Sequence, residues 1–187
     1  MWRAVHNPLA SENTKTLIGE QIHLNMYTTH SYNKWHKRDD PCPLCTTVPV
    51  DEFHSIFHCT AVKNLWREIE PHLLKIHPIP VTKQEMAFGI FGKSKNIILR
   101  NWLTFLLREI ISQHERLAYH NKKGLRNEYD IKMDYNEEVK RQVWQQLNIL
   151  TNINRLEYFQ ESFAVNEYLI AWEDEQWQIL TLFPNTQ

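Results

Sequence analysis

The chain has 187 residues, a formal net charge of −1 and 42% hydrophobic residues, with seven tryptophans. This length and apolar content suit a single globular domain of residues 1–187 with a buried core, and they exclude a disordered chain. The chain has only four glycines and no alternating run of β-branched residues of useful length for a strand. This composition favours helices over sheets, so we expect a mainly α, compact helical domain. No apolar run reaches eighteen residues, so we expect no membrane-spanning helix.

The first predicted helix begins near Ser11. Ile18, Ile22 and Met26 recur at a spacing of four residues, which places them on one helical face. We therefore expect this helix to pack against the core. The polar segment Lys37-Arg38-Asp39-Asp40 follows and is interpreted as a solvated loop.

All three cysteines of the chain belong to one short motif, C-x2-C-x8-H-x4-C, which is formed by Cys42, Cys45, His54 and Cys59. Thiolate and imidazole ligands at such spacing are typical of tetrahedral zinc, so residues 40–66 are predicted to form a CCHC zinc knuckle with one Zn²⁺. Four protein ligands leave no position for a catalytic water. The zinc is therefore expected to be structural.

Two alternatives exist for this motif. A disulfide would leave one of the three cysteines unpaired, and no signal-peptide segment places the chain in an oxidising compartment. We therefore favour a metal site and an intracellular protein, nuclear or cytoplasmic. His58 could replace His54, but it adjoins Cys59, and adjacent side chains on a helical turn point about 100° apart. His54 is the favoured ligand.

Further residues accompany the metal motif: Glu52, Phe57, Ala61 and Leu65-Trp66 around it, Ile18-Gly19, Leu24-Asn25 and His30-Ser31-Tyr32 before it, and Phe88-Gly89-Ile90-Phe91 after it. With the run Cys42-Pro43-Leu44-Cys45, they make residues 12–120 resemble the zinc-knuckle segment near the C-terminus of non-LTR (LINE-type) retrotransposon reverse transcriptases. The resemblance implies a segment that helps to hold RNA or DNA without sequence specificity, while polymerase and nuclease domains elsewhere perform the chemistry.

The catalytic parts of that family are missing from the chain. A reverse transcriptase needs paired aspartates on a hydrophobic β-turn to hold two metal ions. The only Asp-Asp pair, Asp39-Asp40, lies between Arg38 and Pro41 in a polar loop. No Pro-Asp with a downstream acid-x-Lys, as in the nuclease of some relatives, follows Cys59. We therefore expect a non-catalytic segment and not an enzyme.

Three helices are predicted after the cysteine pair. Asp51 is expected to cap a short helix that carries His54, and Thr60 a second helix that Pro71 ends or kinks. The longest helix runs from about Asn96 to His120 and is apolar around most of its circumference. Its narrow polar stripe consists of Arg100, Thr104, Arg108, Ser112 and Glu115.

Residues 127–187 are predicted to form an acidic, helical C-terminal part. This segment carries four Lys/Arg against eleven Asp/Glu, whereas residues 60–126 carry twelve against five. Asp134 with Glu137 predicts a helix start, followed by an apolar face that includes Val139 and Val143. Helical segments are also expected between Leu156 and Phe183. Such an acidic, aromatic part can bind protein partners.

Basic residues at the two ends of the longest helix are the predicted nucleic-acid-binding site: Lys93, Lys95, Lys122, Lys123 and Arg126. Their charges would neutralise phosphates, although Lys122 and Lys123 could instead only cap the helix ahead of Gly124. Our first interpretation is a non-catalytic module that binds RNA or DNA. The alternative is a retained retroelement-derived adaptor with a structural zinc and protein partners, which the near-neutral pI favours.

Overall fold

The computed structural model describes residues 8–9, 12, 15–16, 19, 28–47, 49–51, 53–121, 128–164, 169–174, 176–179 and 182–183. Over these residues, seven helices precede one two-stranded hairpin. The elements are α3 (Thr29–His36), η1 (His54–His58), α4 (Thr60–Ile76), α5 (Lys83–Phe88), α6 (Lys95–Asn121), α7 (Glu128–Asn152), α8 (Leu156–Phe163), β1 (Ile170–Glu173) and β2 (Gln176–Ile179). The prediction of a mainly α fold is confirmed.

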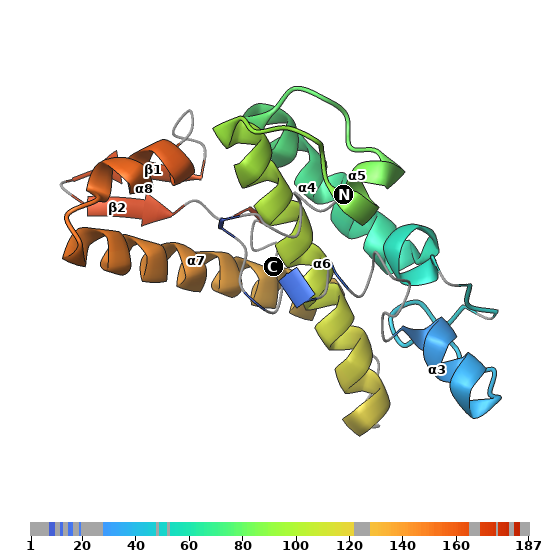
Figure 1. The fold of residues 1–187 in the computed structure, drawn as a ribbon. Coiled ribbons are helices and arrows are strands. Elements are labelled where there is room, and N and C mark those ends of the chain that lie inside the picture. The colour runs from blue at the N-terminus through green and yellow to red at the C-terminus, as the bar shows by residue number, and fades with distance from the viewer. Residues whose placement is uncertain are drawn as a thin grey trace.

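Helix α6 is central, and α4, α5, α7 and α8 all pack against it (Figure 1). Its observed bounds differ from the predicted ones by one residue at each end. Six large apolar side chains of its first half are almost completely buried: Leu99, Trp102, Leu103, Phe105, Leu106 and Leu107. Burial stabilises each side chain of this size by roughly 1.5–3 kcal/mol before the entropy of ordering is subtracted. These residues form the middle of the core.

The polar stripe of α6 is buried as well, because α5 and the end of α4 cover its first half and residues of α3 and η1 cover its second. Arg100 donates from Nε and Nη2 to the two carboxylate oxygens of Glu85, at 2.6 and 2.7 Å. It also donates from Nη1 to the carbonyl oxygens of Leu73 and His77, near the end of α4. A bidentate pair whose remaining donors find carbonyl groups can be buried without leaving a charge unpaired. The stripe therefore joins three helices.

Helix α4 continues through Pro71 to Ile76, so of the two predicted effects of Pro71, an end or a kink, the end is wrong. A proline removes one backbone hydrogen bond and crowds the preceding turn. Here its ring is on the exposed side, while Ile69, Leu73 and Ile76 are buried against the core. This burial on both sides of the proline outweighs the local cost.

Helix α7 begins at Glu128, six residues before the predicted start at Asp134. The extra turns are held by Ile131 and Tyr135, which are both fully buried. The Tyr135 hydroxyl donates to the carbonyl oxygen of Leu103 in α6, at 3.1 Å. Asp134 does not cap the helix: its carboxylate contacts Nε2 of His114 at 2.7 Å. Packing on α6 therefore decides where α7 begins.

The C-terminal part is only partly helical, which corrects the prediction for residues 127–187. After α8, strands β1 and β2 pair antiparallel, with Trp172 opposite Trp177. The two indole rings lie 4.8 Å apart, and such aromatic cross-strand pairs stabilise hairpins. Asp174 has a φ of 49°, a conformation that two-residue hairpin turns require. The hairpin and α8 lie at the opposite end of the molecule from α3 (Figure 1).

Several predictions fall outside the described residues. They concern the apolar face of Ile18, Ile22 and Met26, and the helix end at Gly124. Of the helices that the structure describes, none contains an apolar stretch that could cross a bilayer.

Candidate metal centre

A tight turn presents the first two cysteines. The amide of Thr46 donates to the carbonyl oxygen of Cys42 at 2.8 Å. The amide of Cys42 donates to the carbonyl oxygen of Thr47 at 3.1 Å. Thr46 adopts a left-handed φ of 62°, which reverses the chain. The amide of Leu44 points at the Cys42 sulfur, 3.4 Å away. The turn therefore places two sulfur atoms on its inner side and offers one of them an N–H dipole.

The predicted short helix that carries His54 is present as η1, a single π turn, and Cys59 directly follows it. Asp51 precedes it, and its carboxylate accepts a hydrogen bond from the amide of Phe53 at 2.9 Å. The amide of Cys59 donates to the carbonyl oxygen of His54 at 2.7 Å. On an α-helix, residues five apart point about 140° away from each other. The wider π turn allows His54 and Cys59 to converge.

The structure brings the four predicted ligands together. One ligand atom from each of Cys42, Cys45, His54 and Cys59 lies within 4.8 Å of all the others. The Cys42 and Cys59 sulfurs are 3.9 Å apart, and the Cys45 sulfur is 3.2 Å from Nε2 of His54. All three cysteines are free thiols in the structure. The group can hold one metal ion.

The distance between two of the sulfurs is compatible with a tetrahedral zinc ion. With Zn–S bonds of about 2.3 Å and tetrahedral angles, two thiolates of one site lie about 3.8 Å apart. The separation of the Cys42 and Cys59 sulfurs agrees with this value. Cys42, His54 and Cys59 are buried, while Cys45 lies at the half-exposed edge. Four protein ligands in such a position form a closed site.

The pKa values of the cluster reflect the close contact of its thiol and imidazole groups. Contact with Cys59, together with burial, raises the pKa of Cys42 to about 12. Contact with Cys42 raises the pKa of His54 to about 9. Burial raises the pKa of Cys45, but hydrogen bonds with Thr47 and His54 outweigh it and leave that pKa below its ordinary value. A divalent cation among these groups would favour the thiolate forms.

His58, the alternative ligand, lies outside the cluster. Its Nδ1 contacts the carboxylate of Asp51 at 2.8 Å, and 44% of its side chain is exposed. Phe57 is half-buried and His58 is exposed, and neither belongs to the group of ligand atoms. The structure thus assigns His58 to a surface ion pair.

Buried polar contacts attach the metal centre to the long helix. Glu115 of α6 accepts hydrogen bonds from the amide and the hydroxyl of Thr29, at 2.6 and 2.5 Å. Its carboxylate also contacts Ser55, the neighbour of His54. Sequence reasoning placed Glu115 in the polar stripe but gave it no partner. Glu115 is the one acid of that stripe, and this was the available signal, because such a group needs a donor when it is buried.

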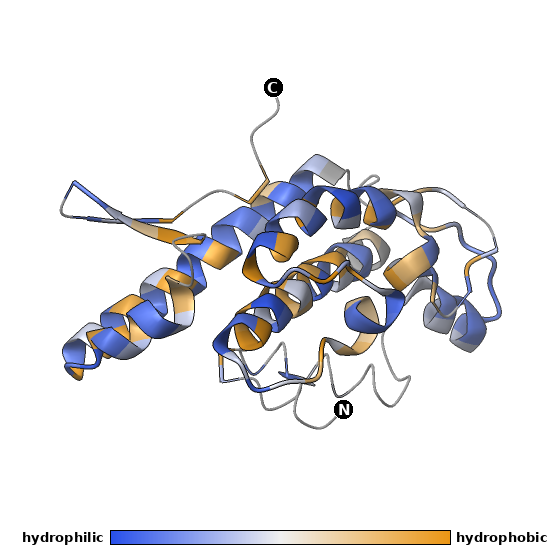
Figure 2. Cartoon of the chain, turned by 90° about the horizontal axis from the view of Figure 1, so that it is seen from above, coloured by the Kyte–Doolittle hydropathy of each residue, from blue (hydrophilic) through white to orange (hydrophobic). Residues whose placement is uncertain are grey.

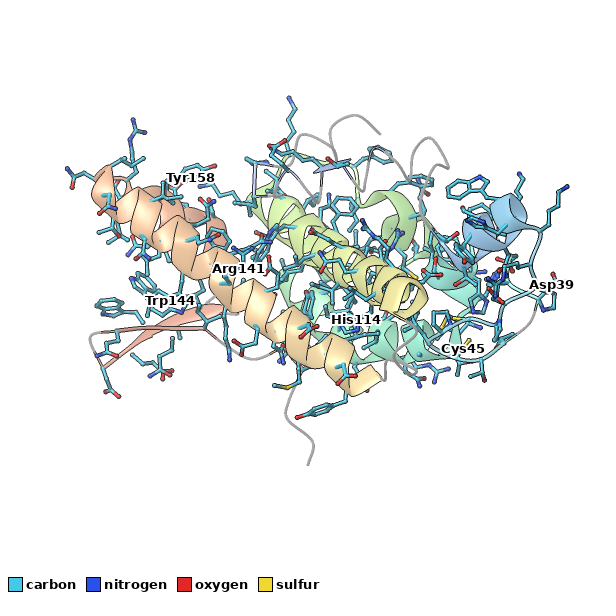
Figure 3. The ribbon with its side chains drawn as sticks, turned by 90° about the horizontal axis from the view of Figure 1, so that it is seen from below. Asp39, Cys45, His114, Arg141, Trp144 and Tyr158 are labelled. Atoms are coloured by element: carbon cyan, nitrogen blue, oxygen red, sulfur yellow. The ribbon has the colours of Figure 1, made fainter. Side chains whose placement is uncertain are left out.

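Hydrogen bonds between Asn33 and Asp40 hold the loop before the cysteines. The Asn33 side chain donates to the carbonyl oxygen of Asp40 at 2.8 Å and accepts from its amide at 3.2 Å. Asp40 also pairs with Arg38 at 2.9 Å, and Asp39 is exposed. Figure 3 shows Asp39 and Cys45 at the same end of the molecule. The aspartate pair therefore belongs to a surface loop beside the metal centre.

The predicted nucleic-acid-binding residues are described only in part. Lys93 is exposed, and Lys95 forms an ion pair with Glu161 of α8. Lys122, Lys123 and Arg126 lie outside the described residues. The described lysines therefore form no cluster, since one of the two is neutralised by the acidic part of the chain.

Comparisons with known proteins identify no family for this chain. No protein-family model matches the chain, and neither a curated protein nor a solved structure matches it. The resemblance to the retrotransposon zinc knuckle therefore depends on the sequence motif.

Proposed function

We propose that the chain binds one structural Zn²⁺ and acts as a non-catalytic nucleic-acid-binding module. The observation that carries the proposal is the Cys42, Cys45, His54 and Cys59 cluster, whose spacing is that of the LINE-type segment it resembles. Free thiol ligands suit a reducing compartment, so we place the protein in the nucleus or the cytoplasm.

Exposed basic residues on the first part of the chain support nucleic acid as the partner. Residues 60–126 carry a formal charge of +7, and Lys63, Arg67 and Lys83 are exposed near the metal centre. Cations of this kind bind phosphates and release counterions, which gives affinity without sequence specificity.

Binding of fluorescent single-stranded RNA, duplex DNA and an RNA stem-loop, each at low and at physiological salt, tests this function. The zinc-loaded protein should bind at least one of them, and the affinity should fall as salt rises. No binding to any of the three at low salt would overturn the nucleic-acid function.

The proposed module performs no chemistry itself. The metal has four protein ligands and so no open position for water. Asp40 is engaged by Arg38, and Asp39 lies in an exposed loop. Magnesium-dependent cleavage of RNA or DNA by the pure protein, lost in Asp39→Asn, would contradict this part of the proposal.

A protein adaptor is the second candidate, and a separate observation favours it. Large apolar side chains are exposed at the end of the molecule opposite the metal: Trp144, Ile149, Ile153, Tyr158 and Trp172. Figure 3 shows Trp144 and Tyr158 at this end, and Figure 2 shows apolar residues on its helices. Exposed apolar patches commonly mark protein interfaces. An adaptor would bind no nucleic acid at low salt, which separates the two functions.

A further inference from the structure

A groove lies beside the metal centre, on the outer side of α4. Its apolar lining comes from Phe57 of η1, Trp66 of α4, Val81 before α5 and Met86 within α5. The groove has a volume of about 190 Å³. Pockets that enclose a whole small molecule measure roughly 300–1,000 Å³, so this groove has room for one flat group of a larger ligand.

Buried and partly buried contacts hold the walls of the groove. Glu70 of α4 accepts a hydrogen bond from the amide of Val81 at 3.0 Å, which fixes the segment before α5 against α4. The carbonyl oxygen of Met86 accepts from Arg108 at 2.9 Å, and Glu85 pairs with Arg100. These contacts preorganise the groove, so a ligand would not have to order it.

Three exposed cations surround the groove. Lys63 and Arg67 line it from α4, one helical turn apart, and Nζ of Lys83 lies 5.7 Å from the centre of the Phe57 ring. Among the described residues, no carboxylate pairs with any of the three, whereas Lys95 and Lys132 are each engaged by a glutamate. The one acid in the lining, Glu70, is occupied by the Val81 amide. The rim is therefore complementary to an anion.

We propose that this groove binds single-stranded nucleic acid, with one base replacing the exposed Lys83 side chain over the Phe57 ring and the flanking phosphates on Lys63, Arg67 and the displaced Lys83. This inference rests on the proposed function and gives it a site. A half-exposed aromatic ring with cations around it is the usual platform for an unpaired base. An acidic peptide could satisfy the cations, but it has no flat group for the ring and the small groove.

The metal would position this site. Phe57 lies on the same π turn as His54, and two residues before Cys59. Its ring also packs on Phe53 of that segment, with centroids 5.7 Å apart. Loss of zinc would therefore displace the ring and weaken binding, although zinc does not touch the ligand.

The test measures binding of a fluorescent oligouridine of about 12 nucleotides, a length within the usual range for single-strand sites. Lys63→Ala/Lys83→Ala should weaken binding and lower the slope of log K against log salt by about 1.4, since each neutralised phosphate contributes about 0.7. The matched control, Lys34→Ala/Lys75→Ala, removes two exposed lysines outside the groove and should keep the affinity of the wild type.

Two further variants examine the ring. Phe57→Leu should bind about tenfold more weakly, because base stacking is lost while the apolar contact remains. Phe57→Tyr keeps the ring and should bind like the wild type. Zinc content and a melting curve for each variant serve as folding controls. If Phe57→Leu fails to fold, the two lysine pairs still decide the outcome, because their side chains are exposed.

The outcomes separate this site from the proposed function. If the wild type binds the oligonucleotide and the groove variants match the control, the site is wrong and the function remains. If the wild type binds none of the nucleic acids at low salt, the function itself fails. If polyglutamate competes as well as the RNA and Phe57→Leu has no effect, the groove recognises charge alone and the base site is overturned.

Discussion

The two ends of the molecule are both built from short elements, but they are stabilised in different ways. The metal-centred end, residues 28–59, contains an eight-residue helix and a five-residue π turn, with a small apolar cluster around Ile56. The C-terminal end, α8 with the hairpin, is held by rings: Phe163 packs on Trp102 at 5.6 Å and on Phe159 at 5.2 Å. Short elements bury little apolar surface and need additional stabilisation. The candidate metal site would supply it at one end of the molecule, and the aromatic cluster supplies it at the other.

Removal of the metal should cause the largest difference in hydrogen-exchange protection between the two ends. Apparent binding free energies of structural zinc in finger peptides are about 10–16 kcal/mol, and this free energy is coupled to folding. A zinc chelator should therefore abolish the amide-exchange protection of residues 28–59 and leave α8 and the hairpin protected. An equal loss of protection at both ends, measured by hydrogen exchange, would contradict the claim that the two ends are stabilised in different ways.

Phe163→Ala should have the reverse effect. Phe163 is 1% exposed, and truncation of such a core ring costs about 3–5 kcal/mol of unfolding free energy. Urea unfolding should show this loss, while the zinc content stays at one per chain. Tyr158→Ala is the control on the same helix: its side chain is 47% exposed, so we expect a change within about 0.5 kcal/mol.

Glu115→Ala should weaken the attachment of the metal-centred end to α6. It leaves the buried amide and hydroxyl of Thr29 without their acceptor, which costs about 1–3 kcal/mol. Exchange in α3 should become faster and the zinc affinity should fall. Burial raises the pKa of Glu115, so its charge is costly there, and the neutral Glu115→Gln should retain most of the stability. Equal losses in both variants would show that the hydrogen bonds are not responsible.

A matched pair of helix caps gives the smallest expected effect. Thr28 accepts a hydrogen bond from the amide of Ser31 at the start of α3, and Thr82 does the same for Glu85 at the start of α5. Each change to alanine should cost about 1 kcal/mol in urea unfolding. Only Thr28→Ala should lower the zinc affinity. A similar decrease in Thr82→Ala would mean that zinc binding reports on overall stability.

Sequence reasoning succeeded where the signal is local. The candidate ligands lie within eighteen residues of each other, and the period of α6 is visible in its own apolar residues. The early start of α7 was missed because it depends on Tyr135 reaching Leu103 in another helix. The hairpin was missed because its signal is the pair Trp172 and Trp177 without a typical turn sequence. Glu115 received no partner because Thr29 is 86 residues away.

The central claim is that zinc, held by His54 and not by His58, organises the metal-centred end. Elemental analysis of the purified wild type, His54→Ala and His58→Ala tests it most directly, with a melting curve for each. We predict one zinc per chain in the wild type and in His58→Ala, and loss of zinc in His54→Ala. A well-folded wild type without zinc, or zinc retained in His54→Ala and lost in His58→Ala, would contradict the claim.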